Sequence, residues 1–177
     1  MEIRRATGIP ADTILGRNFS FTVTEEIAAC TYTTICGRTL VTRPVLPYLK
    51  DNGADPDEFR DISGPDRALF VLAQGDAIFG YALARKSWNR MVGLEDIALD
   101  TSVRARGHGK RLVETVIDWA RDQGVDAVRA ETQSTNVAAC RLYKACGFEL
   151  GGYDKFLYRG IPEHRTAVAL YWYYLFR

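Results

Sequence analysis

Histidine and cysteine are scarce in this sequence, and long hydrophobic runs are missing. The chain has two histidines and four cysteines, with no C-x-x-C pair and no spacing typical of a zinc site. We therefore expect no metal ion, no disulfide framework and reduced thiols. No apolar run reaches the length of about 18 residues that a membrane-spanning helix needs, and the N-terminus lacks the apolar core of a secretion signal. These absences favour a cytoplasmic protein that contacts no membrane.

A surplus of either charge is also missing. Lys and Arg number 23 against 22 Asp and Glu, so the formal net charge is +1. Such a chain has no overall field to attract nucleic acid, and a charged ligand must be recognised locally. Of 177 residues, 47% are apolar and 25% are charged, as in soluble globular proteins. The length predicts a single domain, residues 1–177.

The hydrophobic pattern predicts strands and helices in alternation. A meander of three antiparallel strands is expected first, and apolar residues spaced three and four apart predict a helix between Gly109 and Gly124. The expected strands are 19–23, 39–44, 68–73, 77–84, 91–100, 125–132, 148–158 and 167–176, with a second helix over 136–145. Residues 50–66 read as a surface loop with a helical turn at 57–60. This order predicts an α/β fold with helices packed on a mixed sheet.

The run from Arg104 to Gly109 reads R-x-x-G-x-G at a strand-to-helix junction. Unpaired N–H groups and the positive end of a helix dipole favour an anion there. The dinucleotide fingerprint fails because Leu112 replaces its third glycine, and no Gly-Lys-Ser or Gly-Lys-Thr completes a P-loop. The pattern predicts a pyrophosphate loop, although glycines in such a turn are often only turn glycines.

This loop resembles the acyl-CoA-binding motif of the GCN5-related N-acetyltransferase (GNAT) superfamily. A second segment, Asn136–Phe148, is similar to the superfamily's N-x-x-A-x-x-L-Y-x-x-x-G-F motif. Together they imply a GNAT fold, with splayed central strands and helices on both faces, and acetyl-CoA as the acetyl donor. The residues that the resemblance places against this cosubstrate are Ile97, Ala98, Leu99, Arg104, Ala105, Arg106, Gly107, His108, Gly109, Lys110, Asn136 and Tyr143.

More of the chain is similar to streptothricin acetyltransferases, in particular residues 3–7, 18–23, 94–98 and 153–177. This resemblance implies an N-acetyltransferase that acetylates a primary amine of a small cationic acceptor, most specifically the β-lysine moiety of streptothricin, and so an antibiotic resistance enzyme. One departure is Thr101, where many relatives have a proline, although a Ser/Thr turn also bends the chain.

The resemblance also implies catalytic roles. Tyr143 matches the residue that protonates the departing thiolate, and a backbone N–H near Ile97 would serve as the oxyanion donor. Glu95 and Asp96 are the candidate bases, with Glu95 favoured. Strand alternation places Glu95 on the face of Ile97 and Leu99, and Asp96 on that of Leu94 and Ala98, unless a bulge intervenes. Either carboxylate could instead pair with an arginine.

A polycationic acceptor needs carboxylates and aromatic faces. The candidate acceptor-binding residues are Glu25, Glu26, Tyr81, Trp88, Glu131 and Asp154. Two alternatives remain at this point: a peptide or protein N-acetyltransferase, and a non-catalytic acyl-CoA-binding module. The Tyr-rich terminal strand is a candidate homodimer surface.

Overall fold

The computed structural model describes residues 1–29, 40–51 and 54–177. These residues form two compact units. Unit 1 comprises residues 1–21, 51–128 and 175–177, and unit 2 comprises residues 22–50 and 129–174. Cys30, Cys36 and the first residue of the strand predicted over 39–44 lie outside the described part of the chain.

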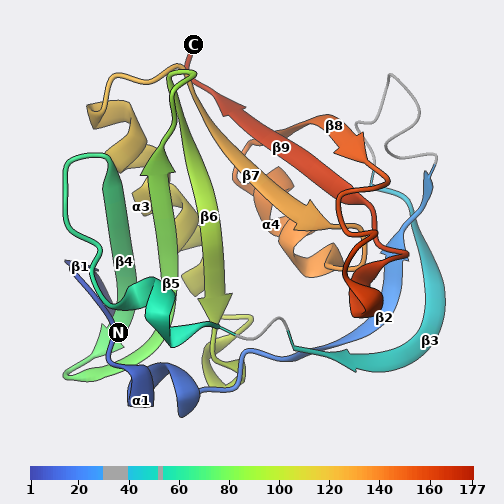
Figure 1. The fold of residues 1–177 in the computed structure, drawn as a ribbon, viewed down its shortest axis with the longest axis horizontal. Coiled ribbons are helices and arrows are strands. Elements are labelled where there is room, and N and C mark those ends of the chain that lie inside the picture. The colour runs from blue at the N-terminus through green and yellow to red at the C-terminus, as the bar shows by residue number, and fades with distance from the viewer. Residues whose placement is uncertain (30–39, 52–53) are drawn as a thin grey trace. The chain divides into compact units, whose positions relative to one another are not determined.

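Unit 1 is built on antiparallel strands in the order β1, β4, β5, β6 (Figure 1). Its elements are β1 (Glu2–Ala6), α1 (Ala11–Leu15), η1 (Pro56–Phe59), β4 (Arg67–Gln74), β5 (Ala77–Lys86), β6 (Met91–Leu99), η2 (Thr101–Val103) and α3 (His108–Asp122). The predicted meander is β4, β5 and β6. All residues from Ala68 to Ala73 are buried, which shows that β4 is covered on both faces.

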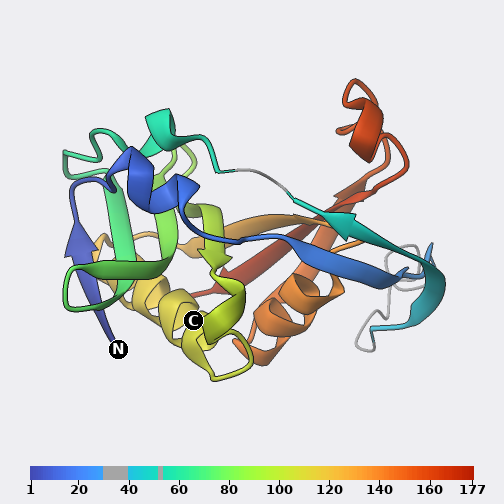
Figure 2. The ribbon, with the colours of Figure 1, turned by 90° about the horizontal axis from the view of Figure 1, so that it is seen from below.

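Helices cover both faces of the unit 1 strands, as Figure 2 shows. On one face, Ile14 of α1 and Phe59 of η1 pack against Leu69 and Tyr81. On the other face lies α3, whose buried side chains recur with helical spacing from Leu112 to Ala120. The expected fold class and the helices on both faces are confirmed. α1 and β1 were not predicted, because five residues carry too little periodicity.

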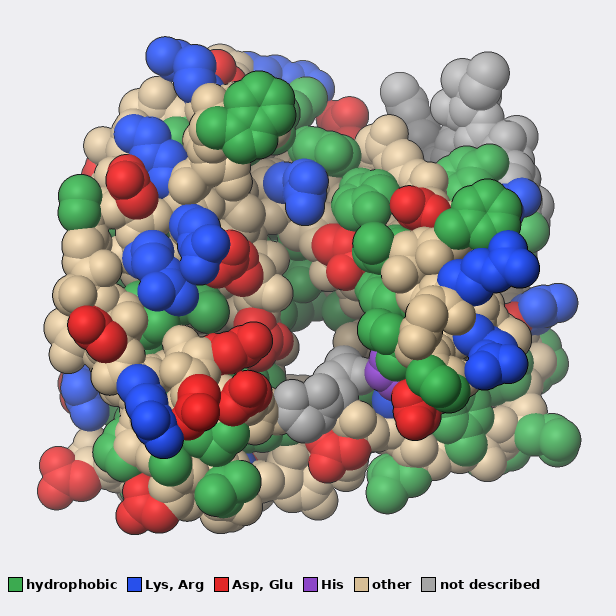
Figure 3. All heavy atoms as spheres, viewed as in Figure 1, with side chains coloured by type: hydrophobic (Ala, Val, Ile, Leu, Met, Phe, Trp, Pro, Cys, Tyr) green, Lys and Arg blue, Asp and Glu red, His purple; other side chains and the backbone are tan. Residues whose placement is uncertain are grey.

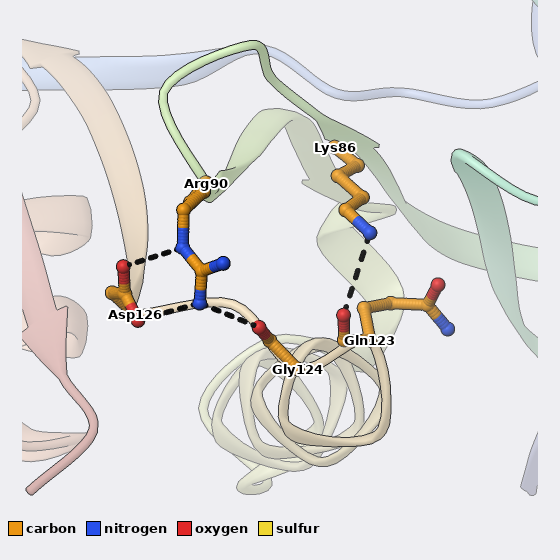
Figure 4. A network of polar contacts seen from close by, with 5 residues as sticks. All are labelled: Lys86, Arg90, Gln123, Gly124 and Asp126. Carbon is orange, nitrogen blue, oxygen red and sulfur yellow. Dashed lines mark hydrogen bonds and ion pairs between the residues drawn. The ribbon is translucent and has the colours of Figure 1, made fainter.

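The C-terminal end of α3 is fastened to the turn between β5 and β6 (Figure 4). Arg90 bonds both Asp126, at 3.0 Å, and the Gly124 carbonyl, at 3.4 Å. Lys86 Nζ donates to the Gln123 carbonyl at 3.4 Å. Cations at this end satisfy the last carbonyls and complement the helix dipole. α3 is therefore anchored at one end, while its N-terminus follows the predicted pyrophosphate loop.

Unit 2 contains the strands β7, β9 and β8 in that order, the pair β2 and β3, and the helix α4. Its elements are β2 (Phe21–Ile27), β3 (Thr42–Lys50), β7 (Ala127–Gln133), α4 (Val137–Ala145), β8 (Glu149–Asp154), η3 (Pro162–His164) and β9 (Ala169–Leu175). The strand predicted over 148–158 is longer than the observed β8, which ends at Asp154. The Asp154 carboxylate accepts the N–H groups of Phe156 and Leu157 and so forms a turn.

Charges are mixed on the face drawn in Figure 3, where Lys and Arg side chains lie among Asp and Glu side chains. Within the described ranges, no helix has both the length and the apolar character needed to cross a membrane. Nor does this part of the chain group three His, Cys, Asp or Glu side chains in a way that could hold a metal ion.

Candidate functional site

The segment after β6 turns the chain from the sheet into α3. Asp100 begins η2, where its carboxylate accepts the Ser102 N–H at 2.9 Å. Ala105 and Gly107 then have positive φ angles of 57° and 80°, and Gly107 is the N-cap of α3. Asp100 and η2 thus form the bend between β6 and the loop, and Thr101 is the first residue of η2.

The N-terminus of α3 has the properties of an anion site. In the described part of the chain, no side chain caps this end, and the first turn contains no acidic residue. A Cβ added at Gly107 would meet no atom within 4 Å, so the backbone is open on that side. First-turn N–H groups and the positive end of the helix dipole therefore lie beside open space, which favours an anion. Gly107, His108, Gly109 and Lys110 lie together here.

Cationic side chains surround this helix end. Burial lowers the pKa of His108, and the charges of Arg111 and Arg106 lower it further, so the imidazole is neutral at pH 7. The positive charge here comes from the arginines and from Lys110, whose ammonium lies 3.6 Å from Glu114. Cations and open backbone at a helix N-terminus favour an anionic group.

Arg104 has a different environment from the rest of the loop. Its guanidinium donates to the carbonyls of Leu99 at 2.9 Å, Ser20 at 2.7 Å and Phe19 at 2.8 Å. All three acceptors belong to the protein backbone, so this side chain ties the segment before β2 to the end of β6. The sequence predicted Arg104 as a cosubstrate ligand. Because its guanidinium bonds three carbonyls of the protein, such a contact would use the Arg104 backbone N–H.

A β-bulge lies in β6 next to the predicted bases. Leu83 pairs with Asp96 whereas Ala84 pairs with Leu94, so Glu95 is an extra residue in β6. The bulge turns Leu94 and Asp96 toward opposite faces of the sheet. Strand alternation predicted that Asp96 shares a face with both Leu94 and Ala98. It shares a face with Ala98 but not with Leu94.

The two candidate bases differ in their partners. The Glu95 carboxylate lies 3.3 Å from the Arg85 guanidinium, and both side chains are partly exposed. Asp96 Oδ2 instead accepts the Tyr81 hydroxyl at 2.7 Å. Burial raises the pKa of Asp96, although the bonds from Tyr81 and from the Ile97 N–H oppose this shift. The N–H predicted as the oxyanion donor thus also contacts the Asp96 carboxylate.

Tyr81 is a buried residue, and an acceptor-binding surface role does not fit it. Its side chain is 2% exposed, and its ring packs on Phe19 and Phe59, with centroids 5.6 and 4.6 Å away. Burial and the Asp96 charge raise the pKa of Tyr81, so the hydroxyl keeps its proton. Tyr81 therefore acts on Asp96 as a hydrogen-bond donor.

The second predicted motif lies in unit 2. Asn136 is the N-cap of α4, where its Oδ1 accepts the Ala139 N–H at 3.1 Å. Tyr143 is 3% exposed, and its ring packs on Phe148 and Trp172, with centroids 5.5 and 6.4 Å away. The motif thus fixes the start of α4 and the packing of the Tyr143 ring.

A family model described as acetyltransferase (GNAT) family matches residues 37–148. The chain belongs to this family. The acetyltransferase is 36% identical to streptothricin acetyltransferase of Escherichia coli, over 78% of this chain and 76% of the relative. It is 30% identical to streptothricin acetyltransferase A of Bacillus subtilis, over 73% and 75%. The predicted family and N-acetyltransferase activity class are confirmed.

Solved structures agree with this assignment. A crystal structure of a protein assigned as a streptothricin acetyltransferase from Bacillus anthracis, in complex with acetyl coenzyme A, matches with a TM-score of 0.82. The two chains are 29% identical, and 99% of each is covered. A nourseothricin acetyltransferase matches with a TM-score of 0.76 and 28% identity, again over 99% of each chain.

The other residues predicted to bind the acceptor of this acetyltransferase lie in diverse places. Trp88 is 97% exposed in the turn between β5 and β6. Glu25 pairs with Arg141 at 2.7 Å, and Glu26 pairs with Arg43. Asp154 forms the turn after β8. Glu131 differs from these residues, because its side chain is half-buried and its carboxylate accepts the Tyr158 hydroxyl.

Sequence reasoning missed Lys50, Gln133 and Tyr158. Lys50 is 5% exposed, and its ammonium donates to Gln133 Oε1 and, at 3.0 Å, to Thr135 Oγ1. Strand alternation offered one signal, because it places Glu131 and Gln133 on the same face of β7. Lys50 and Tyr158 come from distant parts of the sequence, so no local pattern indicates them.

Proposed function

We propose that this chain is an acetyl-CoA-dependent N-acetyltransferase that acetylates a primary amine of a small cationic acceptor, most specifically the β-lysine moiety of streptothricin. The observation that carries this proposal is the similarity to streptothricin acetyltransferases, which covers 78% of this chain in sequence and 99% in structure. The uncapped N-terminus of α3 behind an R-x-x-G-x-G loop supports the donor, because it suits a pyrophosphate. A cytoplasmic location and a homodimer remain predictions.

The donor supplies an acetyl thioester, whose carbonyl carbon the acceptor nitrogen attacks as the C–S bond breaks. The backbone from Gly107 to Lys110 would hold the pyrophosphate, and the partly exposed end of β6, Ile97 to Leu99, would pair with the pantetheine arm. Because these contacts use N–H and C=O groups, they depend on the shape of the loop more than on side chains.

The acceptor nitrogen must lose a proton before it attacks. A lysine-like ammonium has a pKa of about 10.4, so deprotonation at pH 7 costs about 4 to 5 kcal/mol without a base. We assign this role to Asp96. Its raised pKa brings a carboxylate closer to the pH at which a base works best, whereas Glu95 lies beside Arg85.

Transfer would be direct. Tyr143, by its place in the motif, would protonate the leaving CoA thiolate. An acyl-enzyme on Cys140 is disfavoured because burial raises the pKa of this thiol to about 12, so almost no thiolate exists at pH 7. Direct transfer needs only the amine, the base and the acid.

The test is release of the CoA thiol from acetyl-CoA with streptothricin, free lysine, aminoglycosides and peptides as separate acceptors, with product masses measured. We expect streptothricin to gain one acetyl group with the highest kcat/KM. Efficient peptide acetylation without any mass gain on streptothricin would favour a peptide N-acetyltransferase. Acetyl-CoA binding without turnover of any acceptor would indicate a non-catalytic module.

A further inference from the structure

A chain of hydrogen bonds in unit 2 ends at Glu131. The Lys50 ammonium donates to Gln133, the Gln133 side chain bonds the Tyr158 hydroxyl, and this hydroxyl donates to Glu131. Donors in such a chain polarise one another in one direction. The carboxylate of Glu131 is the final acceptor.

This carboxylate has capacity for a further donor. An ionised carboxylate offers about four lone-pair sites on its two oxygens. Among the residues that the structure describes, Tyr158 is the one side chain hydrogen-bonded to Glu131, and it bonds only Oε1. Burial raises the pKa of Glu131 because desolvation penalises its charge, although the Tyr158 bond and the Arg129 charge oppose this shift. A cation that bonds Oε2 would offset this cost.

The surroundings of Glu131 suit an organic cation. Tyr158 is buried, and its ring meets the His164 ring edge to face, with centroids 6.4 Å apart. The Arg129 guanidinium lies 5.4 Å from the centroid of the Tyr171 ring, within the range of a cation–π contact. Negative charge from Asp154 and Glu131 acts on the Tyr171 hydroxyl.

Among the described residues, two cationic side chains, Lys50 and Arg129, belong to the surroundings of this carboxylate. The Lys50 ammonium is committed to Gln133 and Thr135, and burial lowers its pKa. Arg129 acts on Glu131 through its charge and is exposed. Because neither cation is hydrogen-bonded to Glu131, the carboxylate can take an ammonium from solution.

We propose that Glu131, oriented by Tyr158, binds an ammonium group of a polycationic acceptor and so sets the preference for acceptors with more than one positive charge. This inference rests on the proposed function and deepens it. The ligand class is a primary alkylammonium, and Tyr158 is a positioning residue. The site differs from the base Asp96, because it binds a second, charged nitrogen and not the nitrogen that is acetylated.

The first experiment compares Glu131→Gln with the wild type, using streptothricin and a monoamine as acceptors. Glutamine keeps an oxygen for the Tyr158 hydroxyl but removes the charge. We expect the KM for streptothricin to rise about tenfold or more, since a hydrogen bond to a charged group is lost. The KM for acetyl-CoA and the monoamine kinetics should change less than about twofold. Glu163→Gln, an exposed carboxylate of η3, is the matched control.

The second experiment follows the pH dependence in Tyr158→Phe. The Tyr158 bond lowers the pKa of Glu131, so its loss raises that pKa further. Binding of an ammonium needs ionised Glu131, so the pH below which the streptothricin KM rises should move upward. A merely structural role for Tyr158 would lower activity equally at every pH.

Calorimetric titration of streptothricin into both proteins separates this inference from the proposed function. Tighter binding to the wild type than to Glu131→Gln supports the ammonium site even if no acceptor is acetylated. Equal affinities, or an unchanged streptothricin KM in Glu131→Gln with normal acetyl-CoA kinetics, would overturn it.

Discussion

The Tyr81 hydroxyl donates a 2.7 Å hydrogen bond to Asp96 Oδ2, and this contact depends on the bulge at Glu95. Without the extra residue in β6, Asp96 would share the face of Leu94, against α3. With it, Asp96 lies on the face of Tyr81 and Ala98. The bulge therefore gives two adjacent carboxylates different partners. Glu95 lies beside the partly exposed Arg85, whereas Asp96 accepts a hydrogen bond from the buried Tyr81.

Asp96→Asn should lower kcat/KM by about 100-fold or more, because it removes the proposed base but keeps an oxygen for the Tyr81 hydroxyl. Glu95→Gln, the matched neighbour, should change it less than about threefold, as expected for an exposed ion pair. Tyr81→Phe removes a bond that lowers the pKa of Asp96, so the acidic limb of the kcat/KM profile should move to higher pH. Steady-state kinetics from pH 5 to pH 10 measure all three variants, and a larger loss in Glu95→Gln would reverse the assignment.

Asp96→Asn should also stabilise the fold at neutral pH. Burial raises the folded-state pKa of Asp96 above its unfolded value of about 4. Its contribution to stability is therefore fully present below the unfolded pKa and is lost as the pH rises through the folded pKa. Asp96→Asn should raise the Tm more at pH 8 than at pH 4 in thermal unfolding. An equal shift at both pH values would contradict the raised pKa.

Gly107→Val should abolish detectable acetyl-CoA binding while the fold persists. The positive φ of Gly107 costs a β-branched residue about 1 to 3 kcal/mol, but its side chain would meet no protein atom. It would occupy the space beside the first-turn N–H groups. Gly124→Val at the other end of α3 is the control, because its φ is also positive and its surroundings are equally open. If both variants bind acetyl-CoA with wild-type Kd in calorimetry, the loop assignment is wrong.

Periodic segments could be predicted from the sequence, and contacts between distant segments could not. α3 and the strands β4 to β6 carry strong apolar periodicity, and the uncapped helix start follows from Gly107 and its neighbours. The bulge at Glu95 depends on the register between β5 and β6, which no local pattern fixes. Likewise, Tyr158 reaches Glu131 only because the chain turns at Asp154, where the sequence predicted a continuing strand.

Arg104→Lys should weaken acetyl-CoA binding through the shape of the loop. Lysine keeps the charge but cannot bond the Leu99, Ser20 and Phe19 carbonyls together, as the planar guanidinium does. We expect a Kd about tenfold higher with an unchanged salt dependence, and a free energy of unfolding lower by about 1 to 3 kcal/mol. Arg106→Ala should instead flatten the salt dependence, since Arg106 is an exposed cation beside the helix start. Wild-type affinity and stability in Arg104→Lys would contradict a positioning role.

Tyr143→Phe should separate chemistry from packing in α4. Phenylalanine keeps the ring that packs on Phe148 and Trp172, so the Tm should change by less than about 3 °C. Loss of the hydroxyl removes the proposed acid, and kcat should fall about 100-fold or more while the KM for acetyl-CoA stays within about threefold. Tyr173→Phe on β9 serves as the control for loss of a hydroxyl in the same unit.

A pre-steady-state measurement of thiol release tests whether the slowed step in Tyr143→Phe is the chemical one, because a slow product release would leave a burst of thiol. An unchanged kcat from pH 6 to pH 10 would remove Tyr143 from the mechanism and leave the thiolate to be protonated by water.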